Sequence, residues 1–148
     1  MAHVAGDSRV DIIVSNRGTA NRVYTTTSTI TNDIEDVSIQ FGPSLEVGAS
    51  SRTDDTRSIT TIDMNDDGNL DIVVGNSGVT NKVYLNPGAG AFESVMPLDI
   101  GTDTDDTRDI AVEDFSSQRT IVVANAGQKN KLYVMPEEPN FLHSLAQR

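Results

Sequence analysis

Short runs of apolar, β-branched residues separated by polar turns extend along the whole chain. Three of them, at 12–14, 72–74 and 121–123, read Ile-Ile-Val, Ile-Val-Val and Ile-Val-Val. Such residues favour extended backbone, and an unbroken triplet places apolar side chains on both faces of a strand. Inner strands that are covered on both sides need this arrangement. The pattern therefore predicts an all-β chain with central strands buried from two sides.

The apolar triplets belong to a longer segment that occurs three times. The copies begin at Asp11, Asp71 and Thr120, and each contains Asn-x-Gly-x-x-Asn-[Arg/Lys]-[Val/Leu]-Tyr. A second element, Thr-Asp-Asp-Thr-Arg, occurs at 53–57 and again at 104–108. Repetition at a period of about 50 residues is typical of repeat architectures. We therefore treat residues 1–148 as a single repeat domain with units of about 1–52, 53–103 and 104–148, the first clipped at its N-terminal strand.

Each complete unit divides into four predicted strands. In the second unit they cover about 58–63, 70–76, 82–86 and 96–101. The turns between them are rich in Asn and Gly, which tolerate left-handed backbone. Four-stranded antiparallel sheets arranged about an axis are the blades of a β-propeller. We expect a β-propeller-type fold of about three four-stranded antiparallel blades, and a sandwich or solenoid of the same strands is the alternative.

An acidic loop, residues 63–71, lies between the first two predicted strands of the second unit. Oxygen-bearing side chains at its positions 1, 3, 5 and 9, a backbone carbonyl at 7 and a glycine at 6 match what a hard cation with six to eight oxygen ligands requires. A Glu at position 12 would indicate an EF-hand, but Val74 stands there. The loop predicts Ca²⁺, and the alternative is a polar turn held by its own hydrogen bonds. The predicted ligands are Asp63, Asn65, Asp67, Asn69 through its carbonyl, and Asp71.

The acidic loop, the strand Ile-Val-Val-Gly-Asn after it and Asn-Lys-Val-Tyr-Leu-Asn at 81–86 resemble the FG-GAP or VCBS repeat, the calcium-binding propeller blade of integrin type. The resemblance extends over nearly the whole chain but is specific only in the second unit. It implies a propeller fold and a structural calcium ion held by the same five residues. It also implies that Asp66 faces solvent.

The corresponding loops of the other two units depart from this pattern. In the first unit, Asp7 and Asp11 are kept, but the first and third ligand positions are His3 and Ala5. In the third unit the loop is two residues shorter and ends in Thr120. We therefore expect one calcium site, with Asp7 and Asp11 as candidates for a second, weaker one.

The charge and composition of the chain exclude some classes of binding partner. The formal net charge is -11 and the isoelectric point is about 4.3, so nucleic acid and anionic lipid surfaces would repel the chain. No apolar run is long enough to insert into a membrane, and there is no Cys for a disulfide or a thiolate site. Weak calcium modules work at roughly 0.1 to 1 mM, a concentration found outside cells. The expected location is secreted or at the cell surface.

The sequence contains no evident activated nucleophile and no acid/base pair with a partner. We therefore predict a non-catalytic, calcium-stabilised propeller module for adhesion or for binding a protein or glycan ligand. The alternative is part of a polysaccharide lyase or hydrolase, whose carboxylates would be Asp33, Glu35 and Asp36.

Two other repeated features are read as structural. The three Tyr residues are expected to be packing residues, and stacking on a sugar is the alternative. Beside them stand Arg22, Lys82 and Lys131, whose stems would lie over the sheet edge with the charge in water. The Thr-Asp-Asp-Thr-Arg segments are expected to join successive units, with Arg clamped to carboxylates or carbonyls, and binding of a polar ligand at the rim is the alternative.

Three units are fewer than the four to eight blades of a typical propeller. A homodimer that closes a six-bladed ring is our expectation for the assembly. A fragment of a longer propeller and a compact three-bladed stack are the alternatives.

Overall fold

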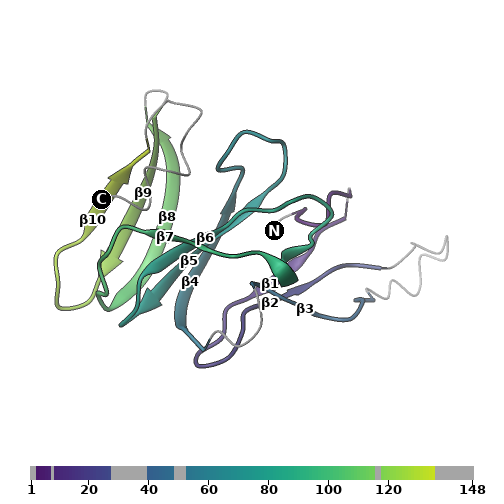
Figure 1. Cartoon of the computed structure of the whole chain (residues 1–148), viewed down its shortest axis with the longest axis horizontal. Helices are drawn as coiled ribbons and strands as arrows, with labels where there is room; N and C mark the ends of the chain where they lie inside the picture. Colours follow the sequence, from purple (N-terminus) through teal and green to yellow (C-terminus); the bar gives the residue numbers. More distant parts are fainter. Residues whose placement is uncertain (1–2, 8, 28–39, 49–52, 116–117, 136–148) are drawn as a thin grey trace, which may run out of the picture.

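The computed structural model describes residues 3–7, 9–27, 40–48, 53–115 and 118–135, which form three antiparallel β-sheets (Figure 1). The first sheet contains β1 (Ile12–Val14), β2 (Arg22–Tyr24) and β3 (Leu45–Glu46). The second contains β4 (Asp55–Ile62), β5 (Asp71–Ser77), β6 (Asn81–Tyr84) and β7 (Leu98–Ile100). The third contains β8 (Thr107–Phe115), β9 (Gln118–Asn125) and β10 (Lys131–Val134). The only helix among these residues is a 3-10 turn, η1 (Phe92–Ser94), and none is long and apolar enough to cross a membrane.

The all-β prediction is confirmed, and the strand count holds for one unit. The second sheet has the expected four strands in the order β4-β5-β6-β7. Within the described part of the chain, the first sheet has no counterpart of β4, in line with the clipped first unit, and the third has no counterpart of β7. The last strand expected in the third unit falls at 136–148, outside the described residues. No sheet closes on itself, and the three sheets form a series.

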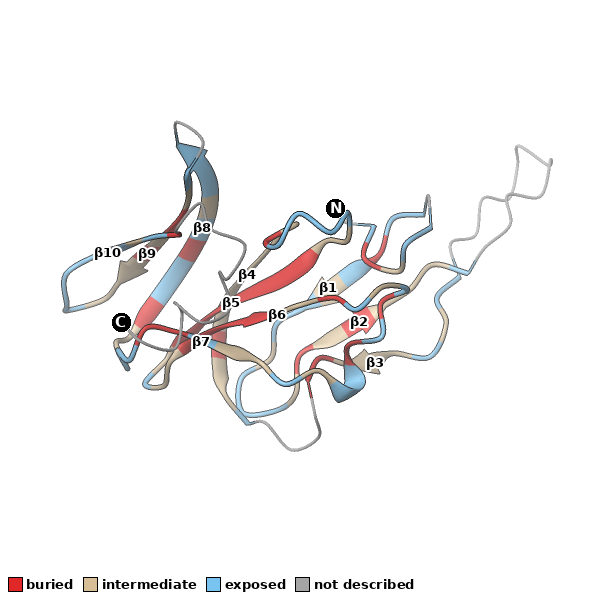
Figure 2. Cartoon of the chain, turned by 45° about the horizontal axis from the view of Figure 1, so that its top comes forward, coloured by how far each residue is buried: buried red, intermediate tan, exposed pale blue. Residues whose placement is uncertain are grey.

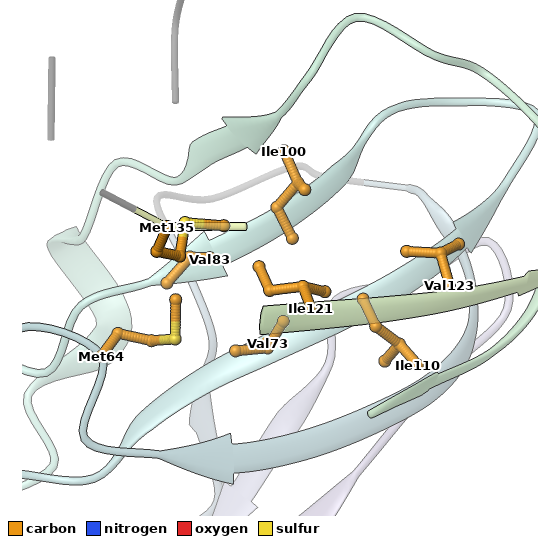
Figure 3. Close-up of a cluster of buried hydrophobic side chains, with 8 residues drawn as sticks. All are labelled: Met64, Val73, Val83, Ile100, Ile110, Ile121, Val123 and Met135. Carbon is orange, nitrogen blue, oxygen red and sulfur yellow. The ribbon is translucent and has the colours of Figure 1, made fainter. Parts of the chain in front are cut away.

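Strand β5 is covered on both faces, as its apolar triplet predicts. Val73 packs toward the third sheet, in a buried cluster with Ile121 and Val123 of β9 (Figure 3). Ile72 and Val74 point the other way, into a second cluster shared with the first sheet. Figure 2 shows the consequence, because β5 is buried along nearly all its length while the outer sheets carry exposed stretches. The central sheet therefore holds the fold together from two sides.

The Asn-x-Gly-x-x-Asn motif closes each hairpin in the same way. In the second unit, Asn81 Oδ1 accepts a hydrogen bond from the backbone N–H of Asn76 at 2.7 Å, and Asn76 Nδ2 donates to the Thr80 carbonyl at 2.9 Å. Between them Gly78 has φ +77°, a left-handed conformation that glycine adopts without strain. The two side chains thus make the hydrogen bonds that backbone groups would make with each other in a tighter turn.

The first two of these hairpins each dock on the Asp-Asp-Thr segment of the following unit. At the second junction Gly78 donates its N–H to the Asp105 carbonyl at 3.0 Å, and Asn81 Nδ2 donates to Thr107 Oγ1 at 3.1 Å. The Thr107 hydroxyl in turn donates to Asn125 Oδ1 at 3.0 Å. The first junction repeats these contacts around Thr56. A buried threonine therefore links two consecutive units at each junction.

Removing this hydroxyl is expected to loosen the junction. Thr107→Val keeps the shape of a side chain that is 1% exposed but leaves the buried amide of Asn81 without its acceptor. We expect a loss of about 1–3 kcal/mol in the free energy of unfolding, measured by urea denaturation, and a similar loss for Thr56→Val. Thr102→Val, at an exposed position, should stay within about 0.5 kcal/mol of the parent. Equal midpoints for Thr107→Val and Thr102→Val would contradict the linking role.

The packing role of the repeated tyrosines is confirmed in the second and third units. The ring of Tyr84 lies over Gly48, and the ring of Tyr133 lies over Gly101. A Cβ atom built on Gly48 would stand 2.6 Å from Tyr84 Cε1, and one on Gly101 would stand 2.8 Å from Tyr133 Cε1. In both pairs the glycine belongs to one unit and the tyrosine belongs to the next unit. The pair therefore joins successive sheets.

The prediction that the basic side chains beside these tyrosines keep their charge in water is wrong for Lys82. Its side chain is 5% exposed, and its ammonium group forms an ion pair with Asp54 at 2.9 Å. Lys131 repeats the arrangement with Asp105 at 2.6 Å. A charge buried to this degree has to be paired. The Asp-Asp-Thr segment supplies that partner, a contact between residues too far apart in sequence for the repeat pattern to indicate.

The expected clamping of the arginine in these segments is confirmed. Arg57 pairs with Asp55 at 2.7 Å, and Arg108 pairs with Asp106 at 2.6 Å. Asp55 also pairs with Arg17 of the preceding unit at 2.9 Å. These contacts reinforce the junctions.

Candidate metal centre

The acidic loop, residues 63–71, connects β4 to β5 and turns sharply at two left-handed residues. Asp66 has φ +58° and Gly68 has φ +88°, so the glycine at position 6 stands where the turn requires it. The carboxylate of Asp63 caps the turn, since it accepts the backbone N–H of Asp67 at 3.1 Å and of Gly68 at 2.8 Å. The first predicted ligand therefore shapes the loop as well.

The middle of the loop is organised by Asp67. One of its carboxylate oxygens accepts the side-chain amide of Asn65 at 2.9 Å. The other accepts the backbone N–H of Asn69 at 2.8 Å and its side-chain amide at 2.9 Å. The Asn69 backbone N–H, helped by the Asn65 amide, lowers the pKa of Asp67, so this exposed side chain is ionised at neutral pH.

The last predicted ligand, Asp71, is fully buried at the start of β5. Its carboxylate accepts the backbone N–H groups of Met64 and Asn86, both at 2.7 Å. Burial raises the pKa of Asp71, these two hydrogen bonds oppose that shift, and the negative charges of Asp67 and Asp63 raise it further. Asp71 therefore stands close enough to two other carboxylates for their repulsion to be felt.

The donor set fits a hard cation. The five predicted residues offer oxygen ligands, and each carboxylate oxygen that accepts one amide hydrogen keeps a second lone pair. The exception is Asp67 Oδ1, which accepts two amide hydrogens from Asn69. In the described part of the chain, no three Asp, Glu, His or Cys side chains are already gathered as a metal-binding group. The carboxylates are instead bonded to the loop's own amides. An ion would thus have to draw the side chains together, as is common when metal binding is coupled to folding.

The first unit has a loop of the same type with fewer suitable side chains. Asp11 is the counterpart of Asp71 and is likewise buried, and it accepts the backbone N–H of Ala5 at 2.9 Å and of Thr26 at 3.2 Å. Asp7 accepts the N–H of Arg9 at 2.9 Å, and the Arg9 guanidinium lies 3.6 Å from its carboxylate. The buried aspartate therefore anchors the loop even where two ligand positions are lost.

In the third unit the loop is replaced by a tight hairpin. Strands β8 and β9 stay paired up to Phe115 and Gln118, which leaves only residues 116–117 between them. This explains the two-residue deletion seen in the sequence. It also leaves no loop of the length that holds Asp63 to Asp71.

Arg119 in this hairpin was missed by the sequence analysis. Its guanidinium pairs with Asp66 at 3.1 Å and Asp114 at 3.0 Å, and it also donates to the backbone carbonyl of Asp63. Asp66 is exposed, as expected, but it is not unpaired. The only signal in the sequence was a basic residue in a shortened acidic loop. Which neighbour it meets depends on how the second and third sheets pack.

A comparison with known protein families supports the resemblance to the FG-GAP repeat. Residues 63–117 match the family described as the FG-GAP-like repeat. This segment is an FG-GAP-like repeat. It starts at the first residue of the acidic loop and ends at the corresponding hairpin of the next unit, so it spans one full period of the chain. The comparisons with curated proteins and with solved structures give no match.

The FG-GAP-like repeat contains all five predicted ligands within nine residues. They lie in one loop, and they stay a prediction as a calcium site. Asp33, Glu35 and Asp36, named as carboxylates for a catalytic alternative, lie outside the described residues.

Proposed function

We propose that the chain is a non-catalytic β-propeller-type module, stabilised by calcium, that serves adhesion or binds a protein or glycan ligand outside the cell or at its surface. The observation that carries the proposal is the acidic loop of the FG-GAP-like repeat, in which the negative charges of Asp67 and Asp63 reach buried Asp71 and raise its pKa. A divalent cation would relieve this repulsion.

The ligands of the ion would be Asp63, Asn65, Asp67, the carbonyl of Asn69, and Asp71. When bound, calcium supplies positive charge and cross-links the loop. Asp71 would then tie the ion to the start of β5, because its carboxylate also holds the backbone at Met64 and Asn86. The ion would in this way fix the end of the second sheet at which β5 begins.

A binding role agrees with the shape of a repeat protein, whose stacked units present a broad, loop-rich surface. The net charge of -11 favours protein or neutral glycan partners over nucleic acid. Among the described residues, the carboxylates of the acidic loop are engaged with backbone amides, which suits a structural site better than proton transfer.

Calorimetric titration with calcium tests the metal site. We expect one site per chain with a dissociation constant of roughly 0.1 to 1 mM, which would suit an extracellular module. Asp67→Ala should abolish the binding, whereas Asp66→Ala, which removes the same charge from the adjacent exposed residue, should preserve it. Equal loss in both variants would show a mere charge effect, and submicromolar affinity would remove the argument for an extracellular location.

Polysaccharide assays separate the binding module from the enzyme alternative. Acidic and neutral polysaccharides are incubated with the protein and examined for new reducing ends or unsaturated products, while a glycan array measures retention. Retention without cleavage supports the proposal. Cleavage would establish a lyase or hydrolase instead.

A further inference from the structure

The two internal sheet interfaces are built from the same positions of the repeat. At the interface of the second and third sheets, the preceding unit contributes Val73, Val83 and Leu85. The following unit contributes side chains of β9 and β10, among them Ile121 and Tyr133. One unit thus uses one face of its strands, and its successor uses the opposite face.

The interface of the first and second sheets follows the same rule. Val23 and Ile13 from the first unit occupy the positions of Val83 and Val73. Ile72 and Tyr84 from the second unit occupy the positions of Ile121 and Tyr133. A single interface type therefore occurs twice within the chain.

Among the described residues, the third sheet leaves one half of this interface open. Its outer side carries Val122, Leu132 and Val134, which we call the third-sheet face and which stand at the positions of Val73, Val83 and Leu85. Leu132 is 67% exposed and Val134 is 47% exposed, whereas Val83 is fully buried. Exposed apolar groups that are buried in an otherwise equivalent unit indicate a surface that receives a partner.

The first sheet leaves the other half open. Its outer side carries Ile12, Val14 and Tyr24, which we call the first-sheet face and which stand at the positions of Ile72, Val74 and Tyr84. Ile12 is 45% exposed, while Ile72 is fully buried. In the part of the chain that the structure describes, the two outer sheets therefore present two different apolar faces, and these are the two halves of the internal interface.

We propose that the first-sheet face of one copy docks on the third-sheet face of a second copy, and that two copies joined at both ends form a closed assembly of six sheets. A second copy is the occupant because each chain carries one half of each kind, so two chains satisfy all four open faces by repeating an interface that the fold already contains. Two-fold closure is the commonest symmetry of homo-oligomers, and it leaves no free face for further growth.

The contact between copies is expected to be weaker than the internal interfaces. Both Asp-Asp-Thr segments of the sequence are already used inside the chain, at the junctions around Thr56 and Thr107. In agreement with this, Asn130 of the third hairpin is exposed, whereas its counterparts Asn21 and Asn81 are buried. The docked contact is apolar without the buried threonine, and we expect dissociation constants of roughly micromolar order.

Sedimentation velocity over a range of protein concentrations, with calcium present, tests the assembly. The wild-type chain should reach a species of twice 15.9 kDa and stop there. Leu132→Asp and Ile12→Asp should each weaken association about tenfold or more, because each damages both contacts of the closed pair. Met96→Asp is the matched control, since Met96 is also 67% exposed but lies on neither face. Thermal melts establish that all three variants are folded.

Mixing the two damaging variants distinguishes this arrangement from any other dimer. A pair of one Leu132→Asp chain and one Ile12→Asp chain has both substitutions in one contact and leaves the other contact intact. The mixture should therefore form a two-chain species at concentrations where each variant alone is monomeric. A wild-type monomer at all concentrations, open-ended growth, a variant effect at only one face, or no recovery on mixing would overturn the proposal.

Discussion

Chelation of calcium is expected to lower the melting temperature of the protein by roughly 10 °C relative to a solution that holds about one hundred times the dissociation constant. The folded acidic loop binds the ion and the unfolded chain does not, which at that excess corresponds to about 2.7 kcal/mol. A chain of 148 residues converts each kcal/mol into a shift of a few degrees. Differential scanning calorimetry with and without chelator measures the shift.

Two variants test whether the shift in melting temperature comes from calcium bound in the acidic loop. Asp67→Ala should melt at about the temperature of the chelated parent, with or without calcium, because it removes a predicted ligand. Asp66→Ala should retain the calcium response, since Asp66 is 83% exposed and its pair with Arg119 is at the surface. Chelator melts that leave the transition of the parent unmoved, or an Asp67→Ala variant that melts like the parent in calcium, would count against a structural ion.

The second large effect is expected from Gly48→Ala. Gly48 has φ +89°, where an L-residue is strained, and an added Cβ would stand 2.6 Å from the ring of Tyr84. Tyr84 is 2% exposed and belongs to the cluster between the first and second sheets, so the ring has little room to move. We expect a loss of roughly 2 to 5 kcal/mol in the free energy of unfolding, from backbone strain and from overpacking together.

Gly78→Ala separates the two contributions. Gly78 has φ +77°, but nothing lies within 4 Å of an added Cβ, so only backbone strain applies. Its expected loss is about 1 to 2 kcal/mol. Denaturant midpoints that rank Gly48→Ala no lower than Gly78→Ala would show that the contact with Tyr84 does not constrain the two sheets.

Local features of the fold could be predicted from the sequence because their causes are local. The apolar triplet of β5 predicts burial on both faces, since a strand with no polar alternation has no face to offer to water. Asn76, Gly78 and Asn81 predict a hairpin because their side chains and left-handed backbone make the turn by themselves. The acidic loop is of the same kind, because Asp63 and Asp67 bond to amides only two to five residues away.

The partners of charged side chains depend on contacts between strands and between units, and the sequence pattern did not reveal them. Lys82 and Asp54 are far apart in the chain, and only the pairing of β4, β5 and β6 within one sheet brings their charges together. Arg119 meets Asp66 because the hairpin of the third unit lies beside the loop of the second. In both cases the sequence shows the charge of each side chain, but only the packing of strands and sheets determines which residue it pairs with.

The sequence by itself determined that the chain is β-structured, that it repeats, and where the acidic loop and the Asn-Gly hairpins lie, because spacing along a strand or turn decides these features directly. The tertiary structure decided which repeated side chains are covered. Val83 and Leu132 stand at the same position of their units, yet one is fully buried and the other is 67% exposed. The difference is that another sheet follows the second within the chain and none is described after the third, and burial depends on that neighbouring surface rather than on the residue.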